Sequence, residues 1–196
     1  MREVELKSVV RDLDAARAAL QVAGAVCVYA GCLEDLRYDT PERTLAHKDH
    51  VLRLRIYRAD PVRSGLDWKG PTTYVDGYKV REEYSVPLGD PSELAILLER
   101  LGYVVTREID REIEQYTLEG AVIRIERYPR MDVLVEVEGE PAAIEHAIAA
   151  LGLPRDGFTA GRLPDFVMAF EARTGERAAI CQRELAGDYR YSVTDA

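Results

Sequence analysis

The chain has 196 residues, of which 47% are hydrophobic and 31% charged, which suits one folded domain with an apolar core. Its formal net charge of −9 disfavours general nucleic-acid binding, because lysine and arginine are not in excess to neutralise a phosphate backbone. No apolar run approaches the length of a membrane span, and residues 1–15 do not have the pattern of a signal peptide. The three scattered cysteines form no Cys-x-x-Cys pair, which favours reduced thiols in a cytoplasmic protein. From the charge and the lack of a long apolar run, we expect partners that include neither nucleic acid nor membrane.

The first third of the chain predicts a strand, a helix and a second strand. Residues 3–7 alternate polar and aliphatic side chains, as a half-buried strand does. Asp12 precedes an apolar stripe that runs to Gly24, which is the pattern of a capped helix with a glycine at its end. Residues 26–38 favour a long, irregular strand, and the polar stretch 39–50 favours a loop.

Further strands and helices follow in runs. The second helix is expected to begin at Asp90 or Ser92 and to end at Gly102. The remaining elements are expected in this order: strands at 51–58, 64–71 and 78–86; a helix at 90–102; strands at 104–118, 121–128 and 132–139; helices at 141–152 and 163–175. Because strands arrive in groups between helices, the pattern predicts an antiparallel α+β fold. We assign residues 1–173 to one domain and 174–196 to a C-terminal tail that is a short helix or loosely ordered.

Charged residues follow a common rule in at least five of these strands. They occupy every second position, and aliphatic residues occupy the positions between them. The charged sets are Glu3, Glu5 and Lys7; Arg53 and Arg55; Lys79, Arg81 and Glu83; Arg124 and Glu126; Glu136 and Glu138.

Two interpretations of this alternation are open. The simpler one is an antiparallel sheet with one face in water and the other on a core. The other is a closed barrel, in which helices cover the aliphatic faces outside and the charged faces line a polar lumen. Segregation of paired glutamates and paired arginines on different strands favours the second interpretation, because a solvated sheet normally mixes both signs.

A lumen of this kind would suit a polyphosphate that carries a divalent cation. Paired carboxylates bind hard cations through oxygen, whereas clustered arginine and lysine bind phosphate oxygens. The ion would bridge the carboxylates and the phosphates.

Several motifs occur in the order and at the spacing of a known family. They are an N-terminal Glu-x-Glu-x-Lys, an Asp-Thr-Pro stretch leading to paired arginines, a Lys-Gly-Pro turn, an Arg-Glu-Glu strand and a late acidic pair. The residues are Glu3, Glu5 and Lys7; Asp39, Thr40, Pro41, Leu45, Arg53 and Arg55; Lys69, Gly70 and Pro71; Arg81, Glu82 and Glu83; Glu136 and Glu138. Over roughly residues 1–150 the chain resembles the CYTH family of triphosphate tunnel metalloenzymes, which includes class IV adenylyl cyclases, thiamine triphosphatases and inorganic triphosphatases.

The resemblance implies a closed eight-stranded antiparallel tunnel with helices outside, and it implies roles by position. Mg²⁺ or Mn²⁺ would be held by Glu3, Glu5, Glu126, Glu136 and Glu138. The triphosphate would be held by Lys7, Arg53, Arg55, Lys69, Arg81 and Arg111. Catalytic roles would fall to Lys7, Glu126 and Arg111. The resemblance also suggests a homodimer.

Two positions depart from the family pattern. The aspartate expected on the strand before the late acidic pair is Glu126, which has a longer reach. A basic pair expected upstream begins at Arg111, but its second member is Ile113. Arg107 or Arg124 could supply the missing cation.

The function expected from this resemblance is metal-dependent hydrolysis of inorganic triphosphate, thiamine triphosphate or a nucleoside triphosphate. One alternative is an adenylyl cyclase that makes cyclic AMP and pyrophosphate from ATP. A second alternative is a tunnel that binds polyphosphate or nucleotide without turnover.

Overall fold

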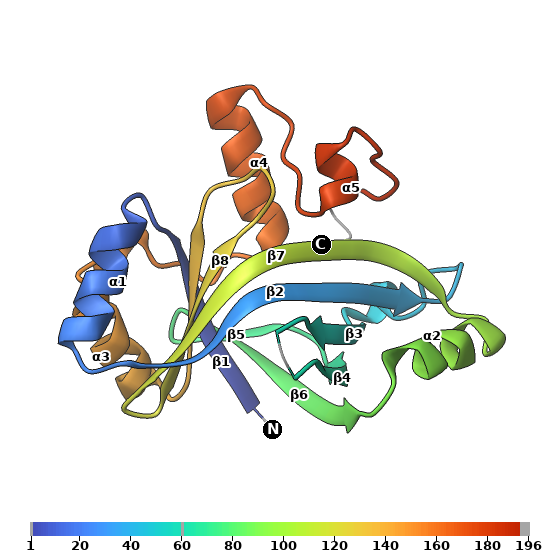
Figure 1. Cartoon of the computed structure of the whole chain (residues 1–196), viewed down its shortest axis with the longest axis horizontal. Helices are drawn as coiled ribbons and strands as arrows, with labels where there is room; N and C mark the ends of the chain where they lie inside the picture. Colours follow the sequence, from blue (N-terminus) through green and yellow to red (C-terminus); the bar gives the residue numbers. More distant parts are fainter. Residues whose placement is uncertain (1, 60, 193–196) are drawn as a thin grey trace.

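A computed structural model describes residues 2–59 and 61–192 (Figure 1). Within them, nine strands form one antiparallel sheet in the order β1-β9-β8-β7-β2-β3-β4-β6-β5. Their bounds are β1 Arg2–Val9, β2 Val26–Asp39, β3 Val51–Tyr57, β4 Arg63–Lys69, β5 Thr73–Val75, β6 Tyr78–Leu88, β7 Val104–Leu118, β8 Ala121–Arg127 and β9 Leu134–Glu138. The helices are α1 Leu13–Val22, α2 Pro91–Arg100, α3 Pro141–Leu151, α4 Leu163–Thr174 and α5 Gln182–Leu185, with single 3₁₀ turns at Ala46–Lys48 and Arg155–Gly157.

The sheet closes on itself through its first strand. β1 pairs with β9 on one side and with β6 on the other, so that eight strands form a barrel without a free edge. The predicted α+β fold with a closed eight-stranded antiparallel barrel is therefore confirmed. The short strand β5, which the sequence does not predict, pairs only with β6 and lies outside the closed ring.

Local sequence sets the helix ends. The Asp12 carboxylate accepts a hydrogen bond from the amide of Ala15 at the start of α1, 2.9 Å away. At the start of α2, Asp90 caps the amide of Ser92 at 2.8 Å, which decides between the two predicted caps. Helix α3 ends at Gly152, whose φ of 67° lies in the left-handed region that glycine adopts without a steric cost.

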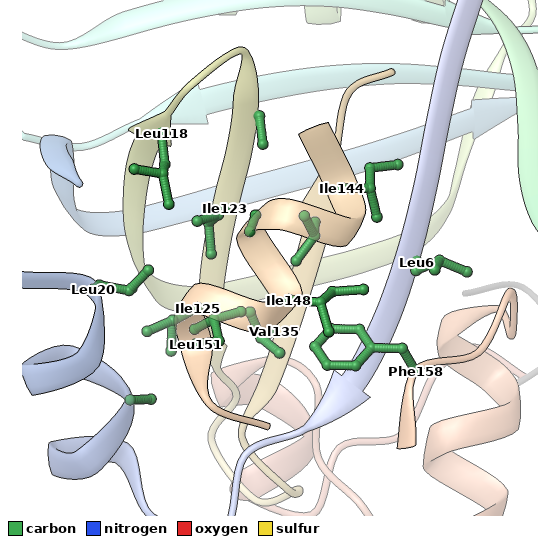
Figure 2. Packing of buried hydrophobic residues seen from close by; sticks show 14 of the residues in the cluster. Leu6, Leu20, Leu118, Ile123, Ile125, Val135, Ile144, Ile148, Leu151 and Phe158 are labelled. Atoms are coloured by element: carbon green, nitrogen blue, oxygen red, sulfur yellow. The ribbon is translucent and has the colours of Figure 1, made fainter. Parts of the chain in front are cut away.

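The main apolar core lies outside the barrel, between its wall and two helices. Figure 2 shows Ile144 and Ile148 of α3 packed against Leu6 of β1 and Val135 of β9. Leu20 of α1 joins the same cluster, and Figure 1 shows α1 and α3 together on this side of the barrel. Burial of each such side chain contributes about 1.5–3 kcal/mol. Because the aliphatic faces of these strands turn outward to the helices, the alternate positions turn inward.

The C-terminal segment packs on one end of the barrel wall. Val167 and Phe170 of α4 form a second apolar cluster with Ile109 of β7 and Leu134 of β9. The main chain of Ala179 pairs with that of Arg130. Figure 1 shows α4 and α5 above β7 and β8.

A buried ion pair ties α5 to β7. Arg107 of β7 and Glu184 of α5 are 2.9 Å apart, and their side chains are 3% and 4% exposed. The Glu184 carboxylate also accepts a hydrogen bond from the amide of Ile180. The region assigned from sequence as a tail thus contains a helix with a buried carboxylate.

We predict that Glu184→Ala destabilises the fold by about 3 kcal/mol or more, because it leaves the Arg107 guanidinium buried without its partner. Urea unfolding would measure the loss. The exposed carboxylate Glu176 provides the control, Glu176→Ala, for which we expect a change of about 0.5 kcal/mol or less. An equally small change in Glu184→Ala would show that α5 is not part of the cooperative unit.

Candidate functional site

A polar cavity of about 200 Å³ occupies the barrel interior and opens beside the loop 39–50. Eleven basic and six acidic side chains line it, so the lining is cationic although the whole chain carries −9. The basic residues are Lys7, Arg37, Arg43, Arg53, Arg55, Lys69, Lys79, Arg81, Arg111, Arg124 and Arg162; the acidic residues are Glu5, Asp35, Asp39, Asp49, Glu126 and Glu136. A cavity of this charge attracts an anionic ligand.

Three arginines converge on one buried aspartate. The Asp35 carboxylate of β2 lies 2.8 Å from Arg55 Nε, 2.9 Å from Arg111 Nη1 and 3.6 Å from Arg53 Nε. Burial by itself would raise the pKa of Asp35, but the three guanidinium groups hold it well below its usual range. Asp35 is therefore ionised and fixes the orientation of Arg55 and Arg111, which donate hydrogen bonds to it.

Asp67 of β4 and Glu126 of β8 extend this arrangement on either side. Asp67 lies 2.7 Å from Arg53 Nη2. Glu126 accepts hydrogen bonds from Arg111 Nε at 2.9 Å and from the Tyr128 hydroxyl at 2.7 Å. Each carboxylate thus holds an arginine in place.

A second group of ion pairs joins lysines to the glutamates of β1 and β9. Lys7 Nζ lies 2.5 Å from both Glu5 and Glu136, and Lys79 Nζ lies 2.6 Å from Glu5. Burial and the neighbouring Glu5 both act to raise the pKa of Glu136, but Lys7 and Arg124 outweigh them and lower it to about 2. Glu5 and Glu136 are ionised at neutral pH.

Two further carboxyl groups on the paired strands β1 and β9 have few neighbours of opposite charge. Glu3 is buried and 2.5 Å from Lys69 Nζ, yet its Oε2 atom has no hydrogen-bond partner within residues 2–59 and 61–192. Burial raises the pKa of Glu3, and Glu5 adds to the effect. Glu138 lies opposite Glu5 in the β1–β9 ladder. Burial, followed by Glu3 and Glu136, raises the pKa of Glu138 to about 7.

The structure brings most of the predicted site residues to one cavity. Nine line it directly: Glu5, Lys7, Arg53, Arg55, Lys69, Arg81, Arg111, Glu126 and Glu136. Glu3 and Glu138 are not among the lining residues but lie on the strands that carry Glu5 and Glu136. Arg81 donates to the main-chain oxygens of Gly70 and Asp49, both at 2.6 Å. Both oxygens of Glu126 are hydrogen-bonded, so it would hold a metal only by releasing Arg111 or Tyr128.

The second departure from the family pattern has a structural explanation. Ile113 packs with Leu33 and Tyr29 in a small apolar cluster of the barrel wall. Arg124 lines the cavity and lies 2.5 Å from Glu136, whereas Arg107 is occupied by α5. Of the two arginines considered as substitutes, Arg124 is the one in the cavity.

The predicted set lacks several residues of the site, among them Asp35, Asp67, Lys79 and Arg162. Lys79 follows the same alternation as Arg81 and could have been included from sequence. Asp35 alternates with Arg37 and Asp39, but the irregular start of that strand hides the pattern. Arg162 lies in no strand, and only the tertiary structure places it at the cavity.

A model of the CYTH domain matches residues 1–149, about three quarters of the chain. The chain belongs to the CYTH family. Solved structures show the same fold. A candidate adenylate cyclase from Vibrio parahaemolyticus is 19% identical with a TM-score of 0.73, covering 85% of this chain and 97% of its own. The PH1819 protein from Pyrococcus horikoshii is 24% identical with a TM-score of 0.70, covering 85% and 98%.

A third structure with this fold carries a functional description. It is a candidate adenylyl cyclase from Hippeastrum, described as having a dominant triphosphatase activity. It is 18% identical with a TM-score of 0.61, and the alignment covers 89% of this CYTH protein and 96% of the Hippeastrum chain. A comparison with curated proteins gives no match. Among the described residues, no helix is both long enough and apolar enough to cross a membrane.

The carboxylates of β1 and β9 fit a divalent cation by their chemistry. They offer oxygen ligands, which hard cations prefer. Glu3 Oε2 lacks a partner among the described residues, and burial raises the pKa of both Glu3 and Glu138, so a cation bound between them would favour their ionised forms. As they stand, no three His, Cys, Asp or Glu side chains of the described residues are grouped closely enough to hold an ion. Lysine ammonium groups contact Glu3, Glu5 and Glu136 instead.

We predict that Glu138→Gln stabilises the protein at pH 8 in the presence of a chelator. The pKa of Glu138 rises from its ordinary 4.5 to about 7 on folding, so its contribution to stability is present below pH 4.5 and is lost as the pH rises through 7. Glutamine cannot ionise, so we expect a gain on the order of 1 kcal/mol at pH 8 and a smaller one at pH 5.

Thermal unfolding at the two pH values would measure the gain. The neighbouring exposed carboxylate supplies the control, Glu140→Gln, which should not change with pH in this way. A Glu138→Gln protein that is no more stable than the parent at pH 8 would contradict the raised pKa.

Proposed function

We propose that this CYTH protein is a divalent-metal-dependent triphosphatase. The observation that carries the proposal is the separation of charges around one cavity. Glu3, Glu5, Glu136 and Glu138 lie on the paired strands β1 and β9, while four arginines line the cavity from β2, β3 and β7, which are not neighbours of β1 or β9 in the ring. A triphosphate with a bound cation complements both sets of charges, because phosphate oxygens pair with guanidinium groups and the cation pairs with carboxylates.

The arginine wall is organised before any ligand binds. Asp35 orients Arg55 and Arg111 and Asp67 orients Arg53, so their remaining N–H groups have fixed directions. Fixed donors stabilise charge that develops on phosphoryl oxygens without reorganising during the reaction. The negative charges of Asp35 and Asp67 offset those of the arginines, which limits the repulsion between the guanidinium groups in a buried site.

The lysines have a different part in this proposal. Lys7 and Lys69 neutralise Glu5, Glu136 and Glu3 in the structure described here. When a triphosphate enters, the ammonium groups can turn to its oxygens and leave the carboxylates to a cation. The exchange keeps every buried charge compensated. A cation held by Glu3, Glu5, Glu136 and Glu138 would supply further neutralisation of the phosphates.

The reaction is attack by water on the terminal phosphorus. A phosphorus–oxygen bond forms to water, the bond to the bridging oxygen breaks, and the two hydrogens of water pass to the orthophosphate and diphosphate products or to solvent. Lys7 and Arg111 stabilise the negative charge of the phosphoryl oxygens. Glu126 acts by holding Arg111 through its Nε atom. The dominant triphosphatase activity named for the Hippeastrum protein, which shares the fold, is in keeping with this chemistry.

One incubation series tests the proposal against its alternatives. The protein would be incubated with Mg²⁺ or Mn²⁺ and, separately, inorganic triphosphate, thiamine triphosphate or ATP, with products separated by ion-exchange chromatography. Orthophosphate from any of the three supports the triphosphatase. Cyclic AMP with pyrophosphate would replace it by a cyclase. Binding without either product would replace it by a non-catalytic tunnel.

We predict that Glu3→Gln lowers metal-dependent orthophosphate release at least tenfold, because a neutral amide is a poor ligand for a hard cation. The matched control is Glu82→Gln, which alters an exposed carboxylate on neighbouring β6. Thermal unfolding would confirm that both variants are folded. If Glu3→Gln and Glu82→Gln retained the same activity, Glu3 would not belong to the metal site.

We predict that Arg53→Gln weakens binding of inorganic triphosphate roughly 10- to 100-fold, which corresponds to losing one charge-assisted contact of about 1.5–3 kcal/mol. Isothermal titration calorimetry with a chelator present would measure the affinity without turnover. Arg58→Gln is the control, because Arg58 lies just after β3 with its side chain 46% exposed and paired with Glu34. Equal affinities for the two variants would place Arg53 outside the binding site.

A further inference from the structure

The cavity continues beyond the barrel wall to a mouth formed by two segments. One is the loop 39–50, which contributes Arg43, Asp49 and His50 to the lining. The other is the start of α4, which contributes Arg162 and Leu163. Arg162 lies outside residues 1–149, so this side of the mouth is a feature of the chain that the family model does not include.

The acidic side chains of the mouth are engaged by the protein itself. The Asp39 carboxylate accepts hydrogen bonds from the amides of Thr40, Leu45 and Ala46, at 2.7–2.9 Å. Asp49 Oδ2 accepts from the amide of Thr72 at 2.6 Å and from Arg162 Nη2 at 2.9 Å. Hydrogen bonds within the frame of the mouth thus satisfy these carboxylates.

The Arg162 guanidinium is hydrogen-bonded through one nitrogen, and its other two nitrogens are also donors. Its Nη2 group bonds Asp49 and the Thr72 hydroxyl, both at 2.9 Å. Within residues 2–59 and 61–192, its Nε and Nη1 atoms make no hydrogen bond to protein, and the side chain is 43% exposed. The guanidinium is therefore anchored at the mouth through Nη2, and its Nε and Nη1 groups have no hydrogen-bond partner among the described residues.

The mouth connects directly to the phosphate-binding wall. Arg81 lines the cavity and donates to the main-chain oxygen of Asp49, while Asp49 holds Arg162. Arg162 therefore belongs to the same cavity lining as Arg81 and lies at the mouth, where an additional anionic group can meet its guanidinium.

This inference rests on the proposed function: we propose that Arg162 selects substrates in which further phosphate groups follow the third phosphorus. The substrate class is linear inorganic oligophosphate of four or more phosphates. Such a chain places a further phosphate at Arg162, where Nε or Nη1 can donate to one phosphate oxygen while Nη2 keeps its bonds to Asp49 and Thr72. Thiamine triphosphate places a cationic ring at the same position and is disfavoured.

The test compares inorganic tetraphosphate, inorganic triphosphate and thiamine triphosphate as substrates of the parent protein and Arg162→Gln. For the parent we expect kcat/KM to be about three- to tenfold higher for tetraphosphate than for triphosphate. In Arg162→Gln this preference falls to within about twofold, and thiamine triphosphate improves relative to triphosphate. Arg155→Gln is the control, because Arg155 pairs with Glu145 on the surface and does not line the cavity.

A second variant separates ligand selection from a structural role. Asp49→Asn removes the carboxylate partner of Arg162 but keeps the guanidinium. Asp49→Asn should retain the preference for tetraphosphate if Arg162 contacts the substrate. If Asp49→Asn loses the preference as Arg162→Gln does, or if Arg162→Gln lowers kcat/KM equally for all substrates, Arg162 merely holds the loop to α4 and the inference is overturned.

Calorimetry with a chelator keeps this inference distinct from the proposed function. If triphosphate is not hydrolysed but tetraphosphate binds more tightly than triphosphate in an Arg162-dependent manner, the proposed function fails and the inference holds. If triphosphate is hydrolysed but the ratio of affinities is the same in the parent and Arg162→Gln, the inference fails and the proposed function holds.

Discussion

Buried charges must be compensated, and most of the barrel interior satisfies this requirement with ion pairs. An unpaired charge in a low-dielectric interior costs several kcal/mol, so most charged side chains of the interior lie beside a group of opposite sign, although Glu138 lies opposite Glu5. Asp35 is the clearest example, because its one carboxylate forms ion pairs with three arginines from β3 and β7. The register of the strands and the composition of the cavity therefore depend on each other.

Local patterns predict the elements of this fold well. Alternation in the strands and the caps at Asp12, Asp90 and Gly152 are properties of short stretches, and they give boundaries close to those observed. Closure of the barrel could be argued because helices need an apolar surface to cover. The strand order could not be derived in this way, and β5 was missed because three exposed residues carry no alternation long enough to detect.

The candidate site was predictable to the extent that its residues follow strand alternation or family motifs. Glu5, Lys7, Arg53 and Arg55 meet both conditions and line the cavity. Asp67 lies two positions before Lys69 in β4 and could have been included by this alternation, whereas the irregular start of β2 hides the alternation around Asp35. The partnership of Arg107 with α5 joins residues 77 positions apart, which no local pattern encodes.

The position of β1 between β6 and β9 has a consequence for how the chain reaches its folded state. Glu5 pairs with Lys79 on one side and with Glu138 on the other, so the ring cannot close before residues far along the chain are in place. Contacts of such sequence separation make folding slow, because loop-closure entropy is lost before the contacts form. Until then Glu3, Glu5 and Lys7 of β1 remain in water, and the order in which the strands assemble determines when these charges become buried. Closure of the ring is thus also the step that creates the charged lumen.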